Sequence, residues 1–519
     1  MHDSTPIETE AITREGRLHS FLNAVERAGN VVPNPAVLFV ILSAIVIVAS
    51  AIVAKLDASV AHPATGEAIR AVNLLSVENL HRLLTSLVSN FTNFAPLGTV
   101  LVALLGIAVA EASGLISAVL RLLVLSSPQR LLTPVVVFAG VMSHTASDIG
   151  YVLLIPLSAM VFLAVGRNPL VGLGASFAGV SGGFSANLLL SPLDAMLAGI
   201  THEAAHIIDP AYTVDPAANY FFMAASALLI TVLGTIVTEK VVAPRLGEYW
   251  GEAEAEKIEQ LKPNEKRGLR FAIIALFAIA GVILLGTVPA DGFLRDLKTG
   301  SLLSSPFLSG IVAVIFFTAV VLGLAYGWGA RTIKSTNDIT SAMEKQMSVM
   351  SVYIVMAFFA AQFIALFNWS NMGVIIAVNG AEFLQALDVG GVFLIVAFVI
   401  AAMVLDLLMG SAAAKWALIA PIFVPMFMIL GFSPELTQAA YRVGDSVINI
   451  VSPLMAYFPL IVAFGRKYDE NFGVGSLMAL MLPYSITFFV GWTLFLIFWF
   501  YFGLPLGPGA ELFYDMPSA

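Results

Sequence analysis

The sequence contains no cysteine and few charged residues. Of its 519 residues, 11% are charged and 59% are hydrophobic, and the formal net charge is −9. The absence of cysteine excludes thiolate nucleophiles, cysteine zinc sites, iron–sulfur clusters and disulfides, and it leaves the redox compartment undetermined. A negative net charge offers no basic face for nucleic acid. A chain this apolar cannot keep most of its length in water, so its solvent is the lipid bilayer.

The N-terminal segment also lacks the pattern of a cleavable signal peptide. No apolar run with a small-residue cleavage site lies within signal-peptide range, and residues 1–32 mix arginines with acidic side chains. We therefore predict a retained cytoplasmic tail at 1–32.

Seven uninterrupted apolar runs are long enough to cross a hydrocarbon core about 30 Å thick, which takes about 20 helical residues. They lie at 36–54, 96–119, 221–238, 271–290, 306–328, 348–367 and 478–502. These runs predict an all-α polytopic membrane protein.

Four further apolar stretches are interrupted by small polar residues near their middles. Residues 131–166 and 391–430 are too long for one helix, and we predict that each forms a re-entrant hairpin. Residues 170–200 and 434–464 hold clusters of Gly, Ser, Asn and Pro, where a helix backbone loses hydrogen bonds unless it lines a cavity. We predict two broken spanning helices there, so the total is nine transmembrane helices and two re-entrant hairpins.

Basic residues set the orientation, because Lys and Arg concentrate in cytoplasmic loops. Residues 240–270 carry seven of them and form the predicted cytoplasmic linker. In the predicted topology, 18 of the 25 basic residues lie in cytoplasmic segments, five lie outside and two lie within the membrane. The N-terminus is then cytoplasmic, and the tail at 504–519 is external.

The two halves, at 33–239 and 271–503, share a short motif. Asn187 is followed by Ser-Pro-Leu at 191–193, and Asn449 is followed by Ser-Pro-Leu at 452–454. The predicted hairpins enter from opposite sides, which makes the repeat inverted. In secondary transporters, such repeats surround a binding site at mid-membrane depth.

Ionisable side chains inside a bilayer are costly, so each is a candidate site residue. The predicted set is Glu111, Asp148, Asp194, Asp406, Lys415, Arg442 and Asp445. We expect Glu111 and Asp406 to lie near helix ends or to pair structurally. Arg442 and Asp445 are three residues apart on one helix face, so they form either a self-neutralising pair or a site in which Arg442 clamps an anion.

Asp194 has no Lys or Arg within 20 residues in sequence. Burial without a cation raises the pKa of a carboxyl group, which favours Asp194 as a proton carrier, and a helix cap is the alternative. A sodium site near Asn187, Asp194 and Asn449 is also possible.

Polar residues at the two hairpin tips could hold carboxylates or cations, although small residues are also what a tight turn requires. They are Ser143, Thr145, Ser147, Asp148 and Ser411. Trp416, beside the second tip, either stacks on an aromatic substrate or packs the hairpin.

One motif points to another class of protein. His202, Glu203 and His206 form a literal H-E-x-x-H, which on a helix places two imidazoles on one face for zinc. The motif lies in the predicted external loop without an obvious third ligand, so we expect a solvated loop helix and keep an intramembrane zinc protease as the alternative.

Four segments together resemble the AbgT family of p-aminobenzoyl-glutamate transporters, over nearly the whole chain. They are 93–100, 177–187, 441–446 and 503–510. The resemblance implies a bowl-shaped homodimer with nine helices and two hairpins per protomer. It also implies uptake of p-aminobenzoyl-glutamate or export of sulfonamides, driven by a cation gradient.

The resemblance further places the transport pathway at particular residues. These are Asp194, Trp416, Pro434, Arg442, Asp445 and Pro453. The chain departs from the family at the second hairpin tip, where Ala413 replaces a serine and Lys415 replaces a neutral amide. Lys415 could therefore favour a dianionic substrate or replace a bound cation.

The sequence thus predicts a secondary active transporter of a small anionic aromatic compound in a bacterial inner membrane, coupled to H⁺ or Na⁺. No enzymatic activity, resident cofactor or nucleic-acid partner is expected. A sodium-coupled dicarboxylate carrier is the alternative within transport.

Overall fold

The protein is almost entirely helical. The computed structural model describes residues 35–516 except 62, 64, 65, 147, 148, 252, 254–259 and 304. The predicted tail at 1–32, with Ser147 and Asp148, therefore lies outside the described residues. Two three-residue strands, β1 (Ser59–Ala61) and β2 (Ala68–Arg70), form an antiparallel pair with Ser59 opposite Arg70.

Eight helical stretches in the described residues are long and apolar enough to cross a membrane. They are α2 (Pro35–Lys55), α3–α4 (Val77–Ala112), α10–α11 (Tyr220–Leu246), α12 (Pro263–Thr287), α14 (Ile311–Ala330), α16 (Ser351–Trp369), α19 (Ala412–Ile429) and α22 (Val474–Tyr501). All seven predicted uninterrupted spans coincide with one of these stretches, which confirms a multi-span membrane protein. The eighth, α19, forms the second arm of the predicted hairpin at 391–430.

Both predicted interruptions in the first half are present. The chain leaves α6 (Leu132–Met142) through a 3₁₀ turn (Ser143–Ala146) and returns through a π-helical segment (Gly150–Leu154) and α7 (Ile155–Ala164). After α8 (Pro169–Phe177) and the π-helical η4 (Ala178–Gly182), the backbone is non-helical until α9 (Pro192–Ala205). Glycine permits the close packing of these segments, because a Cβ atom on Gly179 would lie 2.3 Å from the carbonyl oxygen of Val137.

The second half is interrupted in a similar way. Helix α18 (Gly391–Asp406) is separated from α19 by residues 407–411, and α20 (Pro434–Asn449) is separated from α21 (Phe458–Arg466) by residues 450–457. Ser411 and Ser433 cap α19 and α20 by accepting hydrogen bonds from Ala414 N and Leu436 N. The repeated motif is not structurally equivalent, since Pro192 begins α9 whereas Pro453 lies five residues before α21.

Several helices were not predicted from the sequence. They are most of α5 (Leu115–Leu125), α15 (Thr336–Val349) and α17 (Met372–Ala386), together with the amphipathic α3 (Val77–Thr92). The predicted span at 306–328 is divided at Gly310 into α13 (Pro306–Ser309) and α14. The predicted linker at 240–270 is helical at both ends, because α11 (Ala243–Leu246) extends α10 (Tyr220–Val237) and α12 begins at Pro263.

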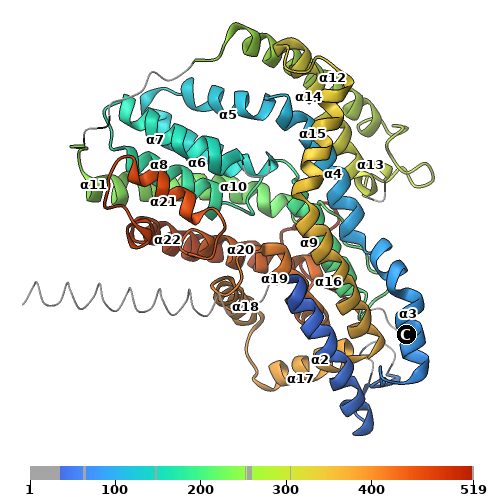
Figure 1. The fold of residues 1–519 in the computed structure, drawn as a ribbon. Coiled ribbons are helices and arrows are strands. Elements are labelled where there is room, and N and C mark those ends of the chain that lie inside the picture. The colour runs from blue at the N-terminus through green and yellow to red at the C-terminus, as the bar shows by residue number, and fades with distance from the viewer. Residues whose placement is uncertain are drawn as a thin grey trace, which may run out of the picture.

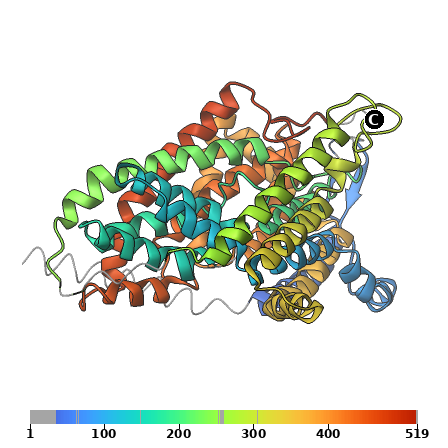
Figure 2. The same cartoon turned by 90° about the horizontal axis from the view of Figure 1, so that it is seen from above.

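Helices from both halves meet around α20. Figures 1 and 2 show α5 to α8 and the α2, α3 and α16 group at opposite ends of the molecule. Between them, α20 packs against α9, α18, α19 and α22. The C-terminal segment lies against the start of α20, where Ser433 N donates to Leu512 O at 3.0 Å. Helix α20 is therefore enclosed by protein along nearly its whole length, which explains why it contains so many polar residues yet is buried.

Candidate functional site

Asp194 and Arg442 form a buried ion pair between the two halves. Asp194 lies in the first turn of α9, where its Oδ2 accepts hydrogen bonds from Ser191 N at 2.6 Å and Ser191 Oγ at 2.7 Å. Arg442, on α20, pairs with Asp194 through Nη2. The expectation that Asp194 lacks a neighbouring cation is therefore wrong, because its partner is 248 residues away in sequence. The helix-cap interpretation is confirmed, and the ion pair adds to it.

A second buried cluster surrounds Lys415. Its ammonium group, in the first turn of α19, pairs with Asp406 at the end of α18 and lies 2.6 Å from Oδ1 of Asp445 on α20. All three side chains are at most 1% exposed. A self-neutralising Arg442–Asp445 pair is therefore wrong, because each residue pairs with a different helix. The expectation that Asp406 pairs structurally near a helix end is confirmed.

The two clusters do not balance in charge. Arg442 and Asp194 sum to zero, whereas Lys415 has two carboxylates for one ammonium group. Buried charges require partners, since desolvation penalises an uncompensated ion heavily. With all five groups ionised, the site carries one surplus negative charge.

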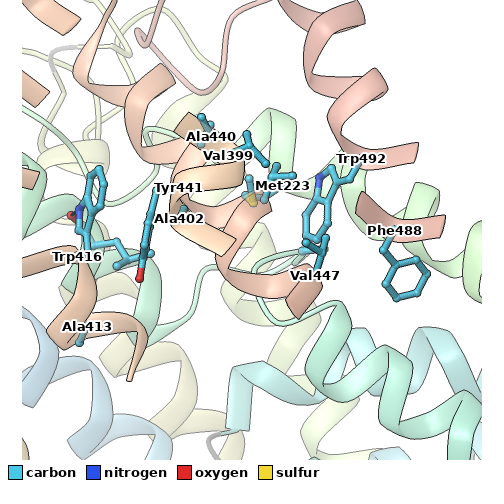
Figure 3. Packing of buried hydrophobic residues seen from close by; sticks show 14 of the residues in the cluster. Met223, Val399, Ala402, Ala413, Trp416, Ala440, Tyr441, Val447, Phe488 and Trp492 are labelled. Carbon is cyan, nitrogen blue, oxygen red and sulfur yellow. Dashed lines mark hydrogen bonds between the residues drawn. The ribbon is translucent and has the colours of Figure 1, made fainter. Parts of the chain in front are cut away.

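Trp416 and Tyr441 line the junction of α19, α20 and α9. Their rings stack at a centroid distance of 4.5 Å (Figure 3), and Trp416 Nε1 donates to Thr201 Oγ1 at 2.9 Å. The Tyr441 hydroxyl lies 2.6 Å from Ala412 O and 3.1 Å from Asp445 Oδ1. In this structure Trp416 packs the hairpin, which is one of its two predicted roles.

The far side of α20 is sealed by aromatic packing. Figure 3 shows Trp492 and Phe488 beside Val447, across α20 from Trp416. Trp492 Nε1 donates to Ser226 Oγ at 2.8 Å. Both charge clusters consequently lie in an apolar setting, where electrostatic interactions are stronger than in water.

A cavity of about 450 Å³ adjoins this site. Its walls include both hairpin tips, through His144 and Ser411, and the start of α9, through Pro192. The opposite wall comes from α4, α15 and α16 and includes the charged residues Glu111 and Lys345. Glu111 lies in the last turn of α4, as expected for a residue near a helix end. A volume of 300–1,000 Å³ is typical of sites for small organic ligands.

His144 is a candidate site residue that the sequence reasoning missed. It lies at the first tip, is 8% exposed, and meets the ring of Phe184 edge-on at 4.9 Å. Its Nε2 atom has no hydrogen-bond partner within the described part of the chain. A buried histidine inside a predicted hairpin tip was a usable signal, but only the fold shows that it borders a cavity.

The remaining predicted site residues are dispersed around these clusters. Ser143 is buried and donates from Oγ to Gly140 O at 2.7 Å, as small residues do within a helix turn. Asn187 lies with its amide group against Val141 O and Ala186 O, at 3.3 and 3.2 Å. Pro434 begins α20, and Asn449 ends it. Pro453 borders a separate cavity of about 570 Å³ near α21.

Some predictions about the tips and ions stay open. Thr145 lies in the 3₁₀ turn of the first tip, and Ser147 and Asp148 fall outside the described residues. A sodium site near Asn187, Asp194 and Asn449 stays a prediction.

The H-E-x-x-H motif forms the C-terminal turn of α9 instead of a solvated loop helix. The rings of His202 and His206 are 4.0 Å apart, but both are engaged by the following loop. His206 Nε2 lies 2.9 Å from Tyr212 O, and His202 Nδ1 accepts from Val214 N at 3.3 Å. Across the described ranges, no group of three or more His, Cys, Asp or Glu residues is arranged to hold a metal ion.

Comparison with known proteins gives a consistent result. A family model described as the AbgT putative transporter family matches residues 20–514. The p-aminobenzoyl-glutamate transport protein of Escherichia coli (strain K12) is 39% identical over 498 residues, which cover 96% of this chain and 97% of that protein.

Two solved structures are also similar. The Alcanivorax borkumensis YdaH transporter, described as having an unusual topology, has a TM-score of 0.87 and 46% identity, and the match covers 92% of this chain and 100% of that chain. Neisseria gonorrhoeae MtrF, described as illuminating a class of antimetabolite efflux pumps, has a TM-score of 0.90 and 48% identity. That match covers 94% of this chain and 100% of that chain.

Proposed function

The chain belongs to the AbgT putative transporter family, and from this premise we propose that it moves p-aminobenzoyl-glutamate or a related aminobenzoate or sulfonamide compound, driven by a cation gradient. Membership makes the protein a transporter and not an enzyme, so the zinc-protease interpretation of His202, Glu203 and His206 is wrong. Family membership leaves open the substrate, the coupling ion and the direction of transport, and the proposal concerns these three properties.

The observation that carries the proposal is the cavity between the two interruptions. It borders both hairpin tips and the helix that bears Asp194, and it includes Tyr151, Phe184 and Tyr353 among its lining residues. Aromatic side chains of this kind suit an aromatic ligand. Lys345, on the exposed surface of α15, supplies a positive charge for a carboxylate at the wall of the same cavity.

Arg442 is the group best suited to recognise the substrate anion once the site rearranges. Its guanidinium has five N–H donors. Nη2 donates to Asp194 and to Ser185 O, whereas Nε has no hydrogen-bond partner among the described residues. A guanidinium binds a carboxylate through two parallel hydrogen bonds. A substrate carboxylate could thus replace Asp194 as the partner of Arg442.

This exchange links substrate to a coupling cation. Protonation of Asp194 would weaken the attraction between Asp194 and Arg442. Arg442 would then bind the substrate carboxylate in place of Asp194. Substrate anion and proton would bind together, so the net charge buried in the carrier would be the same with and without substrate. A cation bound at Asp194 would have the same effect, so the two ions must be separated by experiment.

The orientation belongs to the same proposal. We place the protein in a bacterial inner membrane as a homodimer, with a cytoplasmic N-terminus and an external C-terminus. The excess of Lys and Arg in the predicted cytoplasmic segments supports this orientation.

Flux into proteoliposomes tests the proposal. We expect labelled p-aminobenzoyl-glutamate to accumulate when a pH or sodium gradient is imposed, with unlabelled sulfonamide as a competitor. An imposed gradient of one pH unit supplies about 1.4 kcal/mol per proton, enough for about tenfold accumulation at one proton per substrate. Accumulation of succinate but not of p-aminobenzoyl-glutamate would instead establish a dicarboxylate carrier, and gradient-independent equilibration would indicate a channel.

A further inference from the structure

The Lys415 cluster has the geometry of an occupied cation site. The ammonium group lies between the carboxylates of Asp406 and Asp445, which come from two different helices, and all three side chains are removed from solvent. Hard cations such as sodium are bound by oxygen atoms, and those of carboxylates are the strongest neutralising ligands. The tethered ammonium thus stands where an inorganic monovalent cation would otherwise bind.

Helix stability does not explain a lysine at this position. Lys415 lies in the first turn of α19, where the helix dipole is positive and disfavours a cation. Burial further disfavours the charged ammonium group. Two carboxylates offset both costs, although a single carboxylate would suffice for a neutral pair.

The cluster also lies where a coupling cation would act. It joins both arms of the second hairpin to α20, and Arg442 is one helical turn from Asp445 on the same helix. Tyr441 connects the cluster to the α19 backbone through Ala412 O. The ion pairs of Lys415 with Asp406 and Asp445 therefore join the hairpin tip to α20.

We infer that the ammonium group of Lys415 permanently occupies a monovalent-cation site between Asp406 and Asp445. Because this cation is part of the protein's own side chain, no sodium ion is needed at that site. The inference rests on the proposed function for its consequence in transport, but the site itself is testable without substrate. Removing the ammonium should create a sodium site that the native chain lacks.

The first experiment measures thermal unfolding of the purified full-length protein in detergent. Sodium chloride is titrated against potassium chloride and choline chloride at constant ionic strength. For Lys415→Gln we expect lower stability without sodium and a saturable, sodium-specific rise in the unfolding midpoint. The rise should be about 1–2 °C when sodium is tenfold above its dissociation constant, by mass action on the folded state. The native protein should lack this additional rise.

Two further variants serve as matched controls. Lys415→Arg keeps a fixed positive charge and should not respond to sodium. The double change Lys415→Gln with Asp406→Asn removes one of the two carboxylates and should abolish the response. If Lys415→Gln does not fold, Lys415→Ala, which leaves more room for a hydrated ion, provides the same test.

Flux gives the second readout. When sodium replaces choline on both sides, accumulation of p-aminobenzoyl-glutamate by Lys415→Gln should depend on sodium more strongly than accumulation by the native protein. The inference is overturned if the native protein shows the same sodium-specific stabilisation as Lys415→Gln, or if folded Lys415→Gln and Lys415→Ala respond equally to all three salts. Failure of the native protein to transport p-aminobenzoyl-glutamate would reject the proposed function, while the stability result would stand separately.

Discussion

The two buried charge clusters on α20 differ in composition although they are one helical turn apart. Arg442 has one carboxylate and an unused donor atom, whereas Lys415 has two carboxylates and a compact ammonium group. The first cluster is neutral and has hydrogen-bonding capacity for another anion. The second is negative and already filled. We therefore propose that Arg442 recognises the substrate and that the Lys415 cluster holds the hairpin tip against α20.

Arg442→Ala should produce the largest effect. It removes the anion-binding group and leaves Asp194 as an uncompensated buried charge, which costs about 3–5 kcal/mol of folding free energy. Loss of a charge-assisted hydrogen bond, about 1.5–3 kcal/mol, should weaken substrate binding by at least about tenfold. Titration calorimetry with p-aminobenzoyl-glutamate and thermal unfolding measure the two effects. The control Arg442→Lys keeps the charge but loses the bidentate geometry, so it should recover stability more than affinity. Native affinity in folded Arg442→Ala would assign the residue a purely structural role.

Asp194→Asn should have a large effect on coupling and a smaller one on binding. The amide mimics a permanently protonated carboxyl group, so Arg442 stays available for substrate while gradient-driven accumulation is lost. Counterflow exchange in proteoliposomes, compared with accumulation under separate pH and sodium gradients, distinguishes the two. Ser191→Ala is the matched control, because it removes the hydroxyl that caps with Asp194 without changing charge. Full accumulation by Asp194→Asn under both gradients would contradict a role for Asp194 in coupling.

Neutralising one carboxylate of the Lys415 cluster should cost less than neutralising Asp194. Asp406→Asn or Asp445→Asn leaves one ammonium group with one carboxylate, so no buried charge loses its last partner. We expect each single variant to lower the unfolding free energy by less than about 2 kcal/mol, and the double variant by about 3–5 kcal/mol. Thermal unfolding of the three variants measures this. If one of the single variants lost as much unfolding free energy as the double variant, the other carboxylate would not contribute to the binding of Lys415.

The hairpin tips extend the comparison to accessibility. Ser143 is 1% exposed, whereas Ser411 is exposed at the wall of the cavity. In the cysteine-free chain, Ser411→Cys should therefore react with a maleimide at least about tenfold faster than Ser143→Cys. Membrane-impermeant reagents added from each side also test the predicted topology, which expects cytoplasmic access at Ser143 and external access at Ser411, or access to both tips through their shared cavity. Comparable rates at both positions would contradict the expected difference in exposure, and external labelling of residue 167 would contradict the topology.

The smallest effect is expected at an exposed cap. Backbone hydrogen bonds from Lys334 and Ser335 lower the pKa of Asp338, at the start of α15, below its usual value of 3.8. A lowered folded-state pKa stabilises α15 above the unfolded pKa, and this contribution is lost as the pH falls through the folded pKa. Below about pH 4, the protection of the α15 amides against hydrogen exchange, relative to the intrinsic rate at each pH, should decrease in the native protein. Asp338→Asn should remove that pH dependence, and a variant that still shows it would assign the transition to another group.

Much of the fold could be predicted because a bilayer imposes a simple rule on the sequence. Long apolar runs must be helical in lipid, and the seven predicted spans are all present. The interruption at 183–191 was also visible, because a cluster of Gly, Ser and Asn cannot continue a helix in lipid unless other groups satisfy the backbone. The second hairpin was expected to be interrupted at 410–415, whereas its helices are interrupted at 407–411 and α19 already includes residues 412–415. The amphipathic α3 and α15 were missed because polar residues lower their hydropathy below that of a span.

The candidate site was predictable as a set of residues and not as a set of contacts. Rarity within apolar segments was enough to single out Asp194, Asp406, Lys415, Arg442 and Asp445. Their pairing was not, since spacing along α20 favoured Arg442 with Asp445 while the packed helices join Arg442 to Asp194 and Asp445 to Lys415. Local composition determines which groups must be buried, whereas the partner of a buried charge depends on which helices pack together. Arg442 and Asp194 are 248 residues apart in sequence, and only the tertiary structure brings their helices together.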